Sequence, residues 1–206
     1  MLFRIFFTTL LLFSLATLSA CETVKEYTPF IGDDEEEVET PEDPAAETLY
    51  HEGKASMDGG YYKDAVSSFE EIERLYPFSR LATRAKTMIA FAYYKDEEYD
   101  DAVSIIDRFL QLHPGNKDVP YMYYLKGLSY YDRIADIKRD QGVTKKALDA
   151  LKEVVRRYPD SDYGRDAKLK IDLVQDHLAG KEMEIGRFYL KQRKYVAAIN
   201  RFQNVI

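Results

Sequence analysis

The stretch GKASMDGGYYKDAVSSFEEIERLYP, from Gly53 to Pro77, decides the fold, because its pattern returns 37 residues later as AFAYYKDEEYDDAVSIIDRFLQLHP. In both copies a small residue is followed after twelve positions by Ala and after four more by a large apolar residue. A further apolar residue comes three positions later, and Pro follows five beyond that. Self-similarity at a period of this length is typical of arrays of helical repeats. The matching residues are Gly53, Ala65, Phe69, Ile72 and Pro77, and then Ala90, Ala102, Ile106, Phe109 and Pro114.

Two further copies are less complete. The third keeps the spacing of its second helix, and we expect its first helix around Gly127, separated from the second by eight extra residues. The fourth begins at Gly186, and the sequence ends before its proline, so we expect an incomplete unit in an array that lacks at least one more. The matching residues are Ala147, Leu151, Val154 and Pro159 in the third copy and Gly186, Ala198, Phe202 and Val205 in the fourth.

The pattern has a physical reading as a pair of helices. Small residues allow two helices to cross closely, and Pro ends a helix because it has no N–H and clashes with the preceding turn. These residues resemble the tetratricopeptide repeat (TPR), and several matches at equal offsets disfavour a generic helical bundle. The resemblance implies an all-α fold, a right-handed superhelical array (α-solenoid) that is C-terminally truncated. The expected units are about 46–79, 83–116, 120–161 and an incomplete 162–206, whose first part holds one long helix or two, with a kink allowed near Gly180.

Charge divides the chain into two halves. The net charge of the 206 residues is −7, but residues 21–132 carry 11 Lys and Arg against 25 Asp and Glu, whereas residues 133–206 carry 17 against 11. This asymmetry suggests that the halves meet different partners. The basic half is mixed with acids and has no nucleic-acid-binding motif, so we expect no nucleic acid among the partners.

The first residues indicate export and lipid attachment. Arg4 precedes 14 mostly apolar residues, too few to span a bilayer comfortably, as in a secretory signal peptide covering residues 1–20. The run ends in Leu-Ser-Ala-Cys, which resembles the bacterial lipobox, and Cys21 is the only cysteine. That resemblance implies no cofactor but a covalent S-diacylglycerol and N-acyl lipid on Cys21, anchoring the protein in a membrane. The residue after the cysteine is Glu22. In lipoproteins of enteric bacteria an Asp at this position tends to retain the protein in the inner membrane, so Glu22 favours the outer membrane.

An acidic segment follows the cysteine. Nine of the fifteen residues from Asp33 to Glu47 are acidic, and two prolines interrupt them. Such a run does not bury enough apolar surface to order itself, so residues 21–45 are predicted to be an anchor and extended tether before an array at 46–206. A docking tail is the alternative.

Stacked units would line one face with their first helices. Helical periodicity places the inner positions six and three residues before the small residue and one and four after it. The face is rich in Tyr and Phe with basic residues beside it, which suits an extended peptide that has an aromatic residue and a free carboxylate. The alternative is that these tyrosines pack between helices. The candidate binding residues are Tyr50, Arg84, Phe91, Tyr94, Tyr121, Tyr124 and Tyr131.

No catalytic or metal-binding motif is found. The three histidines, His51, His113 and His177, have no metal-ligand spacing, and the sequence lacks nucleophile-elbow, phosphate-loop and zinc-protease motifs. We therefore expect a protein that is not an enzyme and has neither catalytic nor metal-ligating residues.

Lipobox, acidic segment and repeats together resemble the BamD/ComL-type lipoproteins of outer-membrane β-barrel assembly, from Cys21 to Ile206. This resemblance implies a scaffold at the periplasmic face of the outer membrane. Its partners would be C-terminal segments of unfolded outer-membrane proteins, the β-barrel insertase subunit and companion lipoproteins of the complex. Two alternatives remain: a type IV pilus assembly lipoprotein, and a scaffold bound to carbohydrate or cell wall.

Overall fold

The computed structural model describes residues 43–134 and 141–205, and all regular structure in these two ranges is α-helical. The predicted leader, Cys21 and most of the predicted tether lie outside the described residues. The helices are α2 (Pro44–Asp58), α3 (Tyr62–Leu75), α4 (Arg80–Lys95), α5 (Tyr99–Leu112), α6 (Val119–Tyr131), α7 (Gly142–Arg157), α8 (Asp162–Lys191) and α9 (Tyr195–Gln203).

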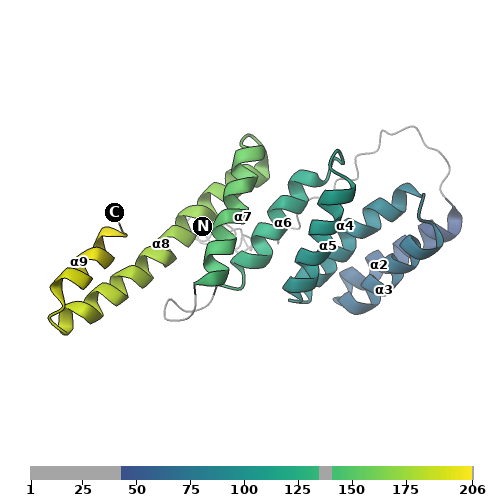
Figure 1. The fold of residues 1–206 in the computed structure, drawn as a ribbon. Helices are drawn as coiled ribbons and strands as arrows, with labels where there is room; N and C mark the ends of the chain where they lie inside the picture. Colours follow the sequence, from purple (N-terminus) through teal and green to yellow (C-terminus); the bar gives the residue numbers. More distant parts are fainter. Residues whose placement is uncertain (1–42, 135–140, 206) are drawn as a thin grey trace, which may run out of the picture. The chain divides into compact units, whose positions relative to one another are not determined.

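The helices pack in sequence order (Figure 1). Each contacts the next, and the first helices of the pairs form a row of their own, in which α2 contacts α4, α4 contacts α6 and α6 contacts α8. This is the arrangement expected of stacked helix pairs, so the predicted all-α TPR array is confirmed. None of the helices in the described residues is long and apolar enough to cross a membrane.

In three of the four pairs a glycine of the first helix receives a large side chain from the second helix. A Cβ built on Gly53 would lie 2.6 Å from Cε1 of Phe69, and one on Gly186 would lie 2.3 Å from Cε1 of Phe202. At Gly127 the same test gives 2.8 Å to Cδ2 of Leu151. The small residue and the large residue sixteen or more positions later are therefore two halves of one contact.

Three of the turns between paired helices, those whose residues are all described, share one backbone conformation. Gly60, Glu97 and Arg193 each have a positive φ, of 74°, 61° and 60°, and each stands five residues before the buried Ala of the second helix. Glycine adopts this region freely, whereas a side chain makes it cost about 1 kcal/mol. The turn is therefore imposed by the packing of the pair and not by a glycine at every repeat.

The ends of the second helices also repeat. Tyr76, His113 and Tyr158 close α3, α5 and α7 with φ near −130° (−128°, −129° and −132°), and each directly precedes a proline. A residue before proline is disfavoured in the helical region, so each helix ends at that position. The predicted role of the three prolines as stop signals agrees with these bounds.

The fourth pair is built on one long helix. α8 runs for 30 residues without interruption through Gly180, so the segment for which one helix or two were expected is one. It contacts α6, α7 and α9, and among the described helices α9 contacts only α8. Ser161 caps it by accepting a hydrogen bond from the N–H of Gly164 at 3.0 Å.

We predict that Gly53→Ala destabilises the protein by about 1 kcal/mol, although Ala is the better helix former. The helix-propensity gain is about 1 kcal/mol, but the added methyl group would overlap the buried ring of Phe69, and overpacking typically costs 1–3 kcal/mol. Urea denaturation measures the effect. In a Phe69→Leu background the same substitution should be neutral or stabilising, and an equal cost in both backgrounds would show that the two residues do not interlock.

Candidate functional site

The candidate site is the row formed by α2, α4, α6 and α8, where the predicted binding residues lie. Tyr50, Tyr121 and Tyr124 are buried, with 7%, 5% and 3% of their surface exposed. The others are partly exposed, and they are Arg84, Phe91, Tyr94 and Tyr131. The face therefore contains some rings that are buried between helices and others that remain partly exposed. Peptide binding by these residues stays a prediction.

At the first pair the contact is between an aromatic ring and a cation. The Tyr50 ring lies 5.6 Å from that of Phe69, and the guanidinium of Arg84 lies 5.7 Å above it. Arg84 also acts electrostatically on Asp118, at the start of α6. Burial raises the pKa of Asp118, and the positive charges of Lys117 and Arg84 oppose that shift. Arg84 thus links three successive first helices.

The second group surrounds Tyr94. Its ring stacks on Phe91 at 6.4 Å and meets the edge of Tyr99 at 5.9 Å. Its hydroxyl donates a hydrogen bond of 2.5 Å to Asp132, at the end of α6. Burial, with the carboxylate of Asp132 beside it, raises the pKa of Tyr94 well above the ordinary tyrosine value. One end of this side chain therefore joins two units, while its partner Phe91 keeps exposed surface.

The third group joins α6 to α8. Tyr163 lies 5.8 Å from Tyr121 and 5.3 Å from Tyr124, and the hydroxyl of Tyr124 donates a hydrogen bond to Asp166. Asp166 also pairs with Lys170 at 2.8 Å. Lys170 in turn lies 5.6 Å from the ring centre of Tyr131. The third group is thus held together by residues of α8 that are absent from the predicted set.

A regular offset could have found the contribution of α8. The face positions of α4 and α6 lie 7, 10, 14 and 17 residues after Pro77 and Pro114. Counting in the same way from Pro159 reaches Asp166, Leu169, Leu173 and Asp176. Leu169 and Leu173 are 66% and 57% exposed, so α8 presents an apolar pair where α4 has the buried Thr87 and the half-buried Phe91.

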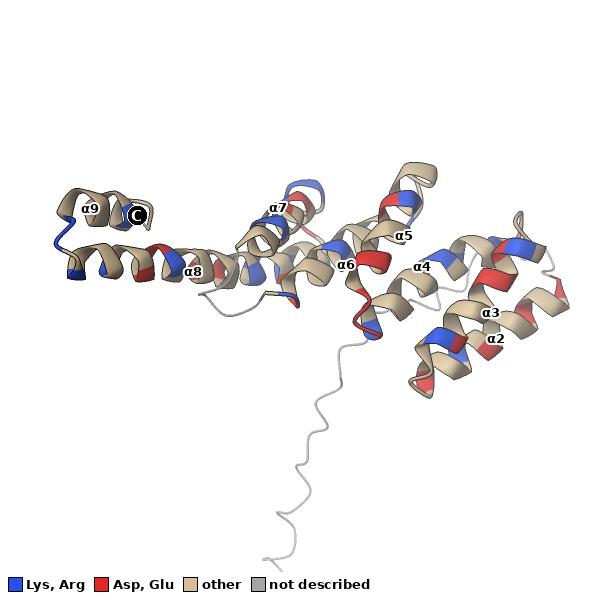
Figure 2. Ribbon diagram, turned by 60° about the horizontal axis from the view of Figure 1, so that its bottom comes forward, with Lys and Arg blue, Asp and Glu red and all other residues tan. Residues whose placement is uncertain are grey.

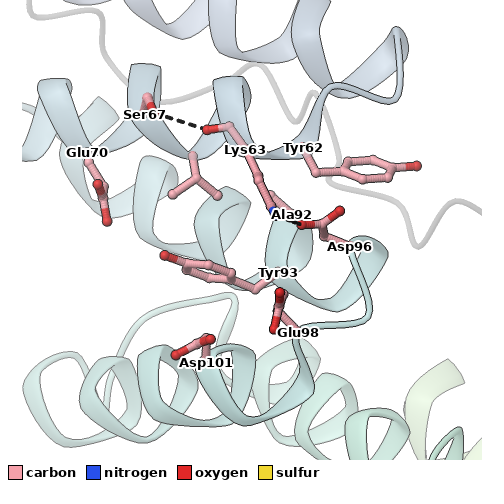
Figure 3. Close-up of a pocket in the computed structure, with 10 residues that line it drawn as sticks. Tyr62, Lys63, Ser67, Glu70, Ala92, Tyr93, Asp96, Glu98 and Asp101 are labelled. Carbon is pink, nitrogen blue, oxygen red and sulfur yellow. Dashed lines mark hydrogen bonds and ion pairs between the residues drawn. The ribbon is translucent and has the colours of Figure 1, made fainter.

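A separate cleft of about 310 Å³ lies among α3, the end of α4 and the start of α5 (Figure 3). The ring of Tyr93 lies among the carboxylates of Glu70, Glu98 and Asp101. Burial and these three charges raise the pKa of the Tyr93 phenol. With Asp96 the cleft has four carboxylates against one lysine, so it repels the free carboxylate of a peptide. The aromatic row is the better candidate for that ligand.

The histidines and carboxylates of the described residues form no metal-binding group. In residues 43–134 and 141–205 no group of three or more His, Cys, Asp or Glu side chains could hold a metal ion. His113 lies against the ring of Phe109 at 5.2 Å, and burial lowers its pKa. It belongs to the packing at the end of α5.

We predict that Tyr94→Phe lowers the free energy of unfolding by about 1–2 kcal/mol at neutral pH, because it removes a hydrogen bond to a charged acceptor. The pKa of Tyr94 is higher in the folded than in the unfolded protein, where it is about 10. Its contribution is therefore complete below pH ~10 and is lost as the pH rises further. Urea titrations at neutral pH and above pH ~10 should show a smaller difference in the free energy of unfolding between parent and variant at the higher pH. Tyr61 is exposed, so Tyr61→Phe should have the stability of the parent chain at both pH values.

Comparison with known proteins adds the family. The protein-family model YfiO, described as "Outer membrane lipoprotein", matches residues 42–206. The chain is similar to the "Outer membrane protein assembly factor BamD" of Caulobacter vibrioides, with 46% identity over 165 residues, 80% of this chain and 54% of that protein. The Rickettsia prowazekii protein of the same name is 46% identical over 159 residues, covering 77% of this chain and 63% of its own.

A third relative of that name, from Neisseria meningitidis serogroup B, is 36% identical over 199 residues, covering 92% of this chain and 72% of its own. The chain thus spans about half to two thirds of the length of the first two relatives. Among solved structures, the Arabidopsis OM64 TPR domain aligns with a TM-score of 0.49 at 16% identity, over 65% of this chain and 97% of that domain. The chain belongs to the YfiO, or BamD-type, family of outer-membrane lipoproteins.

Proposed function

We propose that the chain is a non-catalytic scaffold and recognition subunit in the assembly of outer-membrane β-barrel proteins. The observation that carries the proposal is the 46% identity to two proteins named as outer membrane protein assembly factors. A row of first helices with partly exposed aromatic side chains supports a recognition role, since such side chains give a large contact area at low entropic cost.

The proposed ligand is the C-terminal segment of an unfolded barrel protein, which ends in an aromatic residue and a carboxylate. Phe91, Tyr94 and Tyr131 would offer ring surfaces, and Leu169 and Leu173 would extend the apolar face along α8. Arg84 would attract the carboxylate, although its guanidinium already lies on Tyr50. The buried Tyr50, Tyr121 and Tyr124 would hold the helices in place and contact the peptide little.

The proposed partners follow from the family. The basic half of the chain would dock the insertase subunit, and companion lipoproteins would lie along the array. This half, residues 133–206, includes α7, α8 and α9 and has 17 Lys and Arg against 11 Asp and Glu. Its charge is opposite to that of residues 21–132, which supports a different partner for each half.

The proposed location is the periplasmic face of the outer membrane, through acyl chains on Cys21. The residues Leu18 to Cys21 and the apolar run before them support this anchor, and they lie outside the described residues. Several acyl chains on one cysteine would exceed the two signals that stable anchoring requires.

We predict that Leu169→Ser with Leu173→Ser weakens binding of a synthetic barrel peptide ending in Phe by about tenfold or more. Both side chains are more than half exposed, so their loss should remove contact surface without unfolding α8. Fluorescence titration measures the affinity. Val196→Ser with Ile199→Ser, also exposed, is the matched control and should bind as the parent does. Equal weakening by both pairs would remove α8 from the proposed site.

We predict that Cys21→Ser abolishes acylation and releases the protein from the membrane while the helices stay intact. Incorporation of a labelled fatty acid measures the first effect. Expression behind a leader that an ordinary signal peptidase removes, followed by separation of membranes from soluble periplasm, measures the second. A Cys21→Ser protein that still takes up label, or that still sediments with membranes washed at high salt, would contradict the lipid anchor.

A further inference from the structure

The first two turns between units expose apolar side chains on one edge of the array. Phe78, in the turn between α3 and α4, is fully exposed at 102%. Leu75 and Leu112 are 46% and 60% exposed, and each stands two residues before the proline that ends its helix. Because they occupy equivalent positions of successive repeats, they lie on the same edge, where the second helices end. We call Leu75, Phe78 and Leu112 the turn edge.

The turn edge stands in a basic island of an acidic region. Residues 74–86 contain four Lys and Arg and no Asp or Glu, although residues 21–132 as a whole have 11 against 25. α4 has no acidic residue along its whole length, and Figure 2 shows it with blue segments and none in red. The charges that flank Phe78 are therefore positive on both sides.

Neighbouring carboxylates neutralise only part of this charge. Arg74 pairs with Glu71, and Lys86 lies 3.1 Å from Glu73. The same Glu73 carboxylate is the nearest partner of Arg108, at 3.9 Å, so one negative charge serves two cations. Arg74 and Arg108 keep 66% and 62% of their side-chain surface exposed.

The third turn does not continue this pattern. The position of Leu75 and Leu112 is occupied there by Arg157, which pairs with Glu153, and the position of Phe78 is occupied by Asp160. Among the three turns between units, the combination of exposed apolar tips and surrounding basic residues is thus found at the first two.

We propose that the turn edge lies on an anionic lipid surface, with the ring of Phe78 among the headgroups and acyl boundary and the neighbouring arginines at the phosphates. A protein partner would need a pocket to receive a single protruding ring. A bilayer needs none, because aromatic side chains are accommodated at the level of the lipid headgroups. Each basic residue near such a surface strengthens the binding by about fivefold.

If the chain is also anchored through Cys21, weak binding of the turn edge to lipid would suffice to keep it on the membrane, because the tether raises its local concentration there. The contact goes beyond the proposed scaffold function, since it fixes which edge of the array faces the bilayer. It does not depend on the identity of the peptide or of the insertase.

The test uses the chain from Glu22 onward, which keeps every described helix and lacks both the leader and the acylated cysteine. Sedimentation with vesicles of phosphatidylethanolamine and phosphatidylglycerol measures partitioning, with pure phosphatidylcholine as the neutral comparison. We expect binding to the anionic vesicles only, falling as salt is raised. Phe78→Ser should reduce the partitioning about tenfold, since removing a Phe ring from water strengthens partitioning by about tenfold or more. Arg108→Gln should reduce it about fivefold.

Tyr61→Ser removes an exposed aromatic side chain (66%) from the turn between α2 and α3, at the other end of the helices, and is the control, which should bind vesicles as the parent does. Circular dichroism checks that each variant is folded. Partitioning that is unaffected by Phe78→Ser, or equally affected by Tyr61→Ser, would overturn the proposal. A Phe78→Ser protein that binds vesicles normally but loses a protein partner would overturn it too, because the edge would then be a protein interface.

Discussion

The close crossing of paired helices is the contact on which the rest of this structure depends. A glycine on the first helix lets a ring or a leucine from the second reach the backbone at Gly53, Gly127 and Gly186. This contact fixes the distance and rotation within a pair. In the three pairs whose turns are fully described, the turn passes through a left-handed residue, and α3, α5 and α7 each end just before a proline. Even Glu97 adopts the strained conformation, so packing overrides local preference.

Tyrosine joins one unit to the next. Its ring covers apolar surface in the interior while its hydroxyl reaches a carboxylate of the following unit, as Tyr94 does with Asp132 and Tyr124 with Asp166. An array held in this way has part of its aromatic surface committed to its own cohesion. The face left for a ligand is consequently smaller than the number of tyrosines suggests, and it shifts toward Phe91, Tyr131 and the leucines of α8.

The sequence predicted the helix pairs well because each pair is specified by local spacing. Ala65, Ala102, Ala147 and Ala198 are all buried, and the second helices of the first three pairs end just before prolines that are visible in the sequence. Burial on the candidate face was harder to predict, because whether Tyr121 is covered depends on Tyr163, which comes 42 residues later in another unit. The long helix α8 hid its face residues in turn, since Asp172 stands 13 residues after Pro159, where the earlier units have their small residue, and Gly186 comes 14 residues later.

The long helix α8 has a mechanical consequence. At 1.5 Å per residue its 30 residues measure about 45 Å, and among the described helices only α8 holds α9. A bend in α8 beyond Leu178, which packs against the cluster of Tyr124 and Leu151, would carry α9 away from α6 and α7 while keeping the contact between α8 and α9. The array can therefore act as a rigid block carrying an arm, in which the block retains its shape while the arm adapts its angle to whatever it meets.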